Sequence, residues 1–100
     1  MIQNIFRYDF PELDSEDFYT HLKHKNIEIK TIISNTLKTP QTFKQDCDEW
    51  VVVLSGCAKI ELDGVVHKLK KGDAVFIEAN KEHKVLKTRK TAVWLAVYIR

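Results

Sequence analysis

Short apolar runs separated by glycine turns fill the second half of the chain, and they constrain its fold more than any other feature. Two turns stand out among them, Asp63-Gly64 and Lys71-Gly72-Asp73, and Asp-Gly is a strong hairpin signal. Short strands at regular spacing with such turns predict an antiparallel sandwich or barrel. The predicted strands are 50–54, 58–62, 65–69, 74–77, 83–87 and 91–99.

The first third of the chain has a different pattern. Acidic residues cluster at 14–17 and basic ones at 23–25, with Phe18 and Leu22 four residues apart between them. Acids near the start and bases near the end are typical of a helix, whose buried side these two residues would form. We therefore predict a short N-terminal helical extension over about 11–25. The next segment, rich in isoleucine and threonine, predicts a strand from Ile27 to near Asn35.

Length and composition narrow the class of protein. One hundred residues, 44% hydrophobic and 30% charged, predict one globular domain over residues 1–100. A net charge of +2 is too small to indicate nucleic-acid binding. No apolar run is long enough to span a membrane and the N-terminus does not resemble a leader, so we expect a cytoplasmic protein that binds no membrane. Two cysteines are too few for a disulfide framework.

Two predicted strands are apolar on both faces, 50–54 and 92–99. A barrel covers one face of each strand, and something else must cover the other. The N-terminal helix can cover part of it. Large exposed apolar patches are uncommon on monomers, so the sequence predicts a homodimer. Trp50 and Trp94 would suit its interface if they face outward, and packing in the core is the equally simple interpretation.

The arrangement of glycines, one carboxylate and one imidazole resembles a known family. Glu49, six residues and Gly56 resemble the end of the first cupin motif. Gly72, five residues and then Glu78, Asn80 and His83 resemble the second, and the spacer is as short as in the smallest cupins. The resemblance covers about residues 41–99. It implies an all-β fold, the small double-stranded β-barrel or jelly roll, here with a degenerate first motif.

The family resemblance also implies a metal site, which this chain matches only in part. Cupins hold a divalent metal with two histidines and a glutamate of the first motif and one histidine of the second. Glu49 and His83 match two of these positions. Where the family has His-x-His, this chain has Phe43 and Gln45, or Thr42 and Lys44 in the other phasing.

Most tight zinc or iron sites need three or four protein ligands. We therefore expect no tightly held catalytic metal. The alternative is a divalent metal held by Glu49, His83, Gln45 and water. Cys47, two residues before Glu49, could face the same space, although an unreactive thiol is the simpler interpretation.

The sequence thus predicts a cupin that binds a small polar or anionic molecule, with Glu49, His83, Gln45 and Phe43 as the candidate ligand-binding residues. A basic group around His83 could attract an anion or form a solvated rim; its members are Lys81, Lys84, Lys87, Arg89 and Lys90. Three alternatives stay open. They are a metal-dependent enzyme with the reduced ligand set, an acid/base pair formed by Glu49 and His83, and a non-catalytic structural or partner-binding module.

Overall fold

The computed structural model describes residues 2–100, which form strands and no α-helix. The strands are paired antiparallel in the order β1-β2-β7-β4-β5, with β3 added to β7 and β6 added to β4. Their bounds are β1 Ser15–His24, β2 Ile27–Asn35, β3 Gln41–Phe43, β4 Asp48–Leu62, β5 Val65–Lys70, β6 Ala74–Ile77 and β7 His83–Ile99.

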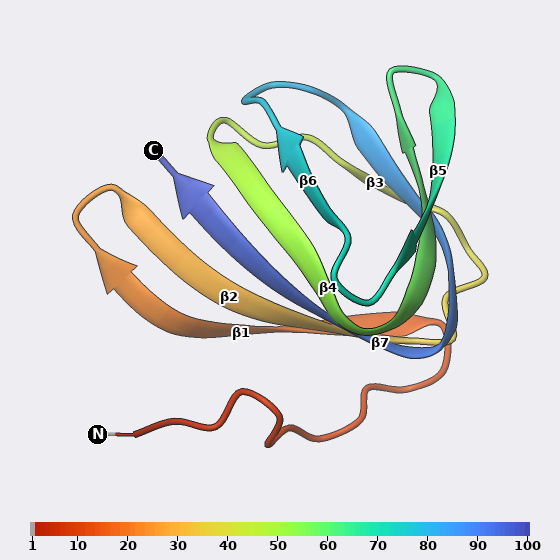
Figure 1. Ribbon diagram of the computed structural model, residues 1–100, viewed down its shortest axis with the longest axis horizontal. Coiled ribbons are helices and arrows are strands. Elements are labelled where there is room, and N and C mark those ends of the chain that lie inside the picture. Colours follow the sequence, from red (N-terminus) through yellow and green to blue (C-terminus); the bar gives the residue numbers. More distant parts are fainter. Residues whose placement is uncertain (1) are drawn as a thin grey trace.

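The two longest strands, β4 and β7, run through both layers of a curved β-structure (Figure 1). The second half of β7 pairs with β2, and its first residues pair with β3. The first residues of β4 pair with β6, and its second half pairs with β5. One layer therefore holds β1, β2, β6 and half of each long strand. The other holds β3, β5 and the remaining halves.

Each long strand bends where it passes between the layers. Gly56 in β4 has a φ of 81° and Lys90 in β7 has a φ of 57°, both in the left-handed region that extended strands do not use. The β4–β7 register shifts on either side of Ser55, which marks bulges of the kind that bend strands. The predicted runs 50–54 and 58–62 are thus one strand with a corner at Gly56, and 83–87 and 91–99 are likewise one strand.

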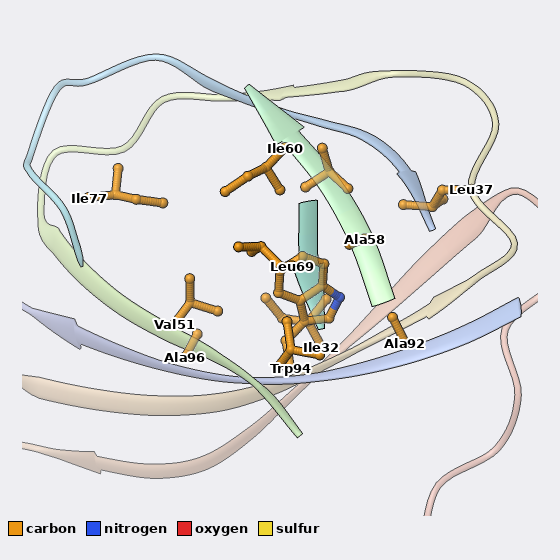
Figure 2. Close-up of a cluster of buried hydrophobic side chains, with 12 residues drawn as sticks. Ile32, Leu37, Val51, Ala58, Ile60, Leu69, Ile77, Ala92, Trp94 and Ala96 are labelled. Atoms are coloured by element: carbon orange, nitrogen blue, oxygen red, sulfur yellow. The ribbon is translucent and has the colours of Figure 1, made fainter. Parts of the chain in front are cut away.

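The hydrophobic core fills the space between the layers (Figure 2). Trp94 and Ile32 lie on one layer, and Ala58, Ile60 and Leu69 lie on the other. Trp94 is only 4% exposed, so the core interpretation of this residue is confirmed over the interface one. An all-β structure with a layered apolar core agrees with the predicted fold class.

The predicted helix over 11–25 is wrong, because residues 15–24 form β1 and pair antiparallel with β2. Phe18 lies opposite Ile32 and faces the interior. A register shift after Thr20 then turns Leu22 to the other face. Pairing with β2 gives β1 a partner for its backbone groups, and this tertiary contact overrides the helix-like distribution of charge.

Asn80, in the segment that resembles the second motif, has a φ of 64°, a left-handed conformation that asparagine tolerates better than most residues. The strand β3 was not predicted from the polar break around Pro40. No helix in the part of the chain that the structure describes could cross a membrane.

Candidate functional site

A cavity of about 50 Å³ lies between the two layers and has a mostly apolar wall. Its volume is enough for a few water molecules. Phenylalanine, tyrosine and tryptophan contribute four of its side chains. Apart from Trp94, five side chains carry groups that can form hydrogen bonds. The lining residues are Glu16, Phe18, Ile32, Phe43, Gln45, Glu49, Val51, Ile60, Ile77, His83, Val85, Trp94 and Tyr98.

Glu49 is the most deeply buried polar group of the cavity, with 4% of its surface exposed. It lies near the start of β4, opposite Ile77 of β6 and Tyr98 of β7. Strand alternation turns Glu49 and Val51 inward and leaves Trp50 outward. Gln45 donates from Nε2 to Glu49 Oε1 at 2.6 Å. Gln45, which precedes β4, thus holds the carboxyl group of a residue four positions later in the chain.

His83 begins β7 and faces Glu49 across the cavity. Its Nε2 atom lies 3.8 Å from Glu49 Oε1, and its Nδ1 atom lies 3.3 Å from the Lys81 carbonyl oxygen. Only an N–H can donate to a carbonyl, so this contact assigns a proton to Nδ1 and turns Nε2 toward the carboxyl group. Phe43 of β3 stacks on the imidazole, with 5.7 Å between ring centroids and 21° between planes.

Burial decides the electrostatics of this site. It raises the pKa of Glu49 above its usual value, although the hydrogen bond from Gln45 and the nearby His83 act in the opposite direction. Burial and the charge of Glu49 also raise the pKa of Tyr98, so its hydroxyl group remains protonated and able to donate. The site thus offers a carboxyl group of increased basicity beside donors and an imidazole.

A second carboxyl group, that of Glu16, lines the same cavity. Ser34 donates its hydroxyl to Glu16 Oε2, and Trp94 Nε1 donates to Ser34 Oγ at 3.0 Å. Burial raises the pKa of Glu16, and the hydrogen bond from Ser34 opposes this. Sequence reasoning missed Glu16 because it lay in the predicted helix; the alternation of Glu16, Phe18 and Thr20 was the signal that could have placed it.

A family model described as "Cupin domain" matches residues 29–98. The chain belongs to the cupin family. No curated protein matched it. The match begins at residue 29, within β2, and so extends beyond the region 41–99 of the sequence resemblance.

Solved structures with the same fold agree with this assignment. A protein of Ralstonia eutropha JMP134, described as a proposed mannose-6-phosphate isomerase, is 34% identical, with a TM-score of 0.86 over 99% of this chain and 97% of that one. A cupin domain of an XRE family transcriptional regulator from Enterobacter cloacae is 15% identical, with a TM-score of 0.75 over 85% and 96%. An HTH_3 family transcriptional regulator from Vibrio cholerae is 19% identical, with a TM-score of 0.73 over 85% and 51%.

The cupin metal position does not fit a tightly bound transition metal in this chain. Within residues 2–100, no group of three or more His, Cys, Asp or Glu side chains could hold an ion. Glu49 and His83 supply two donors, and the Gln45 amide directs its NH₂ group to Glu49. The ring of Phe43, which has no donor atom, stacks on one face of the His83 imidazole. The donor set therefore falls short of the three or four that such ions require.

All four residues predicted for the site lie together in this cupin. Glu49, His83, Gln45 and Phe43 line one cavity. Cys47 is buried but is not among the cavity-lining residues. Burial raises its pKa, which disfavours the reactive thiolate.

The basic group around His83 does not form a single rim. Lys81 Nζ lies 3.1 Å from Asp63 Oδ2, and Lys84 Nζ lies 3.8 Å from Glu61 Oε2. Lys87 and Arg89 line a different hollow, on the face of the sheet away from the cavity.

Proposed function

We propose that this cupin binds a small, uncharged polar molecule in the cavity, without a tightly held catalytic metal. The observation that carries the proposal is the convergence of Gln45, His83 and Tyr98 on the buried Glu49 carboxyl group. A carboxyl group with a raised pKa accepts or donates hydrogen bonds well, and apolar walls strengthen such bonds by excluding water.

The charges of the cavity favour a neutral ligand over the anion that the sequence also suggested. Among residues 2–100, the lining of the cavity includes two carboxyl groups, those of Glu16 and Glu49, and no lysine or arginine. Lys30 lies beside one lining residue, with its Nζ atom 5.6 Å from the ring centroid of Tyr98, but it is not itself a lining residue. A carboxylate or phosphate ligand would therefore face like charge in a medium of low dielectric constant, which is costly.

The Ralstonia relative suggests a sugar phosphate, and two features of this chain argue against carrying that substrate over. The cavity has a volume of only about 50 Å³, and no lysine or arginine is among the lining residues that the structure describes to hold a phosphate group. We therefore propose a ligand of a few heavy atoms, or one end of a longer molecule. Proton transfer between Glu49 and His83 is the chemistry that the pair could add.

Replacing Glu49 by glutamine is expected to weaken ligand binding and to leave the fold as stable or more stable at pH 7. Because burial raises the pKa of Glu49 in the folded state, the folded protein loses stability as pH rises from the ordinary carboxyl range through that raised pKa. Glutamine removes this loss. The stability difference between variant and parent should shrink as pH falls toward 4. Urea denaturation at a series of pH values measures it.

The binding arm of this test uses acetamide and acetate, which have nearly the same shape. We expect acetamide to raise the melting temperature in a saturable way, acetate to have no effect, and Glu49→Gln to weaken acetamide binding at least tenfold, about 1.4 kcal/mol. His83→Phe provides a matched variant that keeps the stacked ring.

Stoichiometric metal in protein purified without an affinity tag, lost in Glu49→Gln, would favour the metal-dependent enzyme. No thermal shift with any small neutral amide or polyol would favour a structural module.

We also propose that the chain forms a homodimer through the outer face of β4, β6 and β7. Trp50 is 41% exposed and Phe76 56%, and they lie opposite each other on β4 and β6. Val97 continues the row on β7. Their outward neighbours Val52 and Leu95 are apolar as well. A patch without charge suits a second copy of itself, since an isologous interface pairs equal surfaces.

Trp50→Lys is expected to convert the dimer to a monomer at micromolar concentration, because it places two lysines at a symmetric apolar contact. Val65→Lys is the control, since Val65 is an exposed apolar residue at the β4–β5 hairpin. Light scattering coupled to size exclusion measures the mass. A parent protein that is monomeric at micromolar concentration would contradict the proposal.

A further inference from the structure

The outer face of the second layer carries a cluster of positive charge that the cavity does not explain. A shallow hollow of about 410 Å³ lies over β4, β5 and β7. We call it the basic groove. Its basic lining residues are Lys59, Lys68, Lys70, Lys87 and Arg89, and its other lining residues are Cys57, Ala58 and Leu69. It shares no residue with the cavity.

The strand register places these charges in two rows. Lys59 lies directly opposite Lys68 on one side and Lys87 on the other. In the next row, Cys57 lies between Lys70 and Arg89. Cβ atoms of residues directly opposite are about 5 Å apart, and like charges at that distance destabilise a sheet. The repulsion within these rows lowers the stability of the free protein, and a bound anion would relieve it.

Acidic side chains do not balance the basic groove. In residues 2–100, the one lining residue with an ion-pair partner is Lys70, whose Nζ atom lies 3.9 Å from Asp73 Oδ2. Nearby lysines outside the groove are paired more closely, as Lys81 is with Asp63 at 3.1 Å. A second hollow beside β7 shares Lys87 and Arg89 and adds Lys38 and Lys90. The positive field therefore extends beyond one hollow.

We propose that the basic groove binds a small polyanion that carries two or three linked phosphate groups. Five basic side chains match a ligand of that charge, with lysines as point charges and Arg89 as a bidentate donor. The volume lies in the range of small-molecule sites. No aromatic side chain lines the groove, so it has no platform on which nucleic-acid bases could stack.

The test is titration of the full chain with inorganic tripolyphosphate at 150 mM salt by calorimetry. Lys59→Gln keeps most of the side chain and removes the central charge. We expect it to weaken binding at least tenfold and not to lower the melting temperature, because the repulsion from Lys68 and Lys87 is relieved. Lys23→Gln is the matched control. It removes one charge from β1, outside the groove, and should change the affinity less than twofold.

Every other result contradicts the inference. Equal weakening by Lys59→Gln and Lys23→Gln would mean that net charge alone attracts the anion. No saturable binding at millimolar tripolyphosphate would mean that the lysines form a solvated face. Binding to phosphatidylserine vesicles or to single-stranded DNA, with none to tripolyphosphate, would assign the surface to a different partner. None of these outcomes bears on Glu49 and the cavity, because the two sites share no residue.

Discussion

Gly56→Ala is expected to destabilise the protein by more than about 4 kcal/mol, a large part of the roughly 5–15 kcal/mol that holds a typical domain folded. Gly56 has a φ of 81°, and a Cβ atom there would lie 2.4 Å from the Thr91 carbonyl oxygen and 2.9 Å from Ala92 Cα. The left-handed conformation alone costs a non-glycine residue about 1–2 kcal/mol. The contact adds to this, because backbone atoms of β7 would have to move.

Gly64→Ala is the matched control for this prediction. Gly64 has a φ of 76°, close to that of Gly56, but an added Cβ atom would meet nothing within 4 Å. It should therefore show the conformational cost alone, about 1–2 kcal/mol. Urea denaturation of the two variants measures both values. Equal losses would mean that the close approach of β4 and β7 at the corner contributes little.

Trp94→Ala is expected to cost about 3–5 kcal/mol, as is usual when a large buried aromatic side chain is removed. Trp94 is 4% exposed, packs in the core and lines the cavity. The variant would also enlarge the cavity and leave Ser34 without the donor at 3.0 Å. Trp94→Phe keeps most of the packing and loses that hydrogen bond, so a loss of about 1–2 kcal/mol is expected.

Thermal and urea unfolding of the two Trp94 variants separate packing from hydrogen bonding. Phe10→Ala, at a residue that is 69% exposed, is the control for loss of an aromatic ring at the surface and should change stability by less than about 0.5 kcal/mol. If Trp94→Phe were as damaging as Trp94→Ala, the bond to Ser34 and through it to Glu16 would matter more than the packing.

The strands of the second half could be predicted because their signals are local. The Asp63-Gly64 hairpin and the turn at Gly72 depend on residues next to each other in the chain, and both appear in the structure. The continuity of β4 and β7 could not be predicted in this way. A left-handed residue inside a strand, Gly56 or Lys90, looks like a break until its partner strand is known.

The candidate site was predictable to the extent that its residues lie in the two motifs. Glu49, Gln45 and His83 were identified, and the structure brings them into one cavity. Glu16 and Phe18 were missed because they reach the cavity from β1, whose charge distribution imitates a helix. The pairing that places them there joins β1 to β2, and nothing in the sequence of β1 alone specifies that partner.

The central position of β7 affects how the chain can fold during synthesis. β7 is the last strand, ending at Ile99, yet it pairs with β2, β3 and β4. A nascent chain stalled before residue 83 would contain six strands without the one that joins them, so its apolar faces would stay uncovered. Such long-range pairing slows folding. Compact structure is therefore expected to form late, after the last strand has left the ribosome, and ribosome-bound chains that lack β7 should remain sensitive to protease.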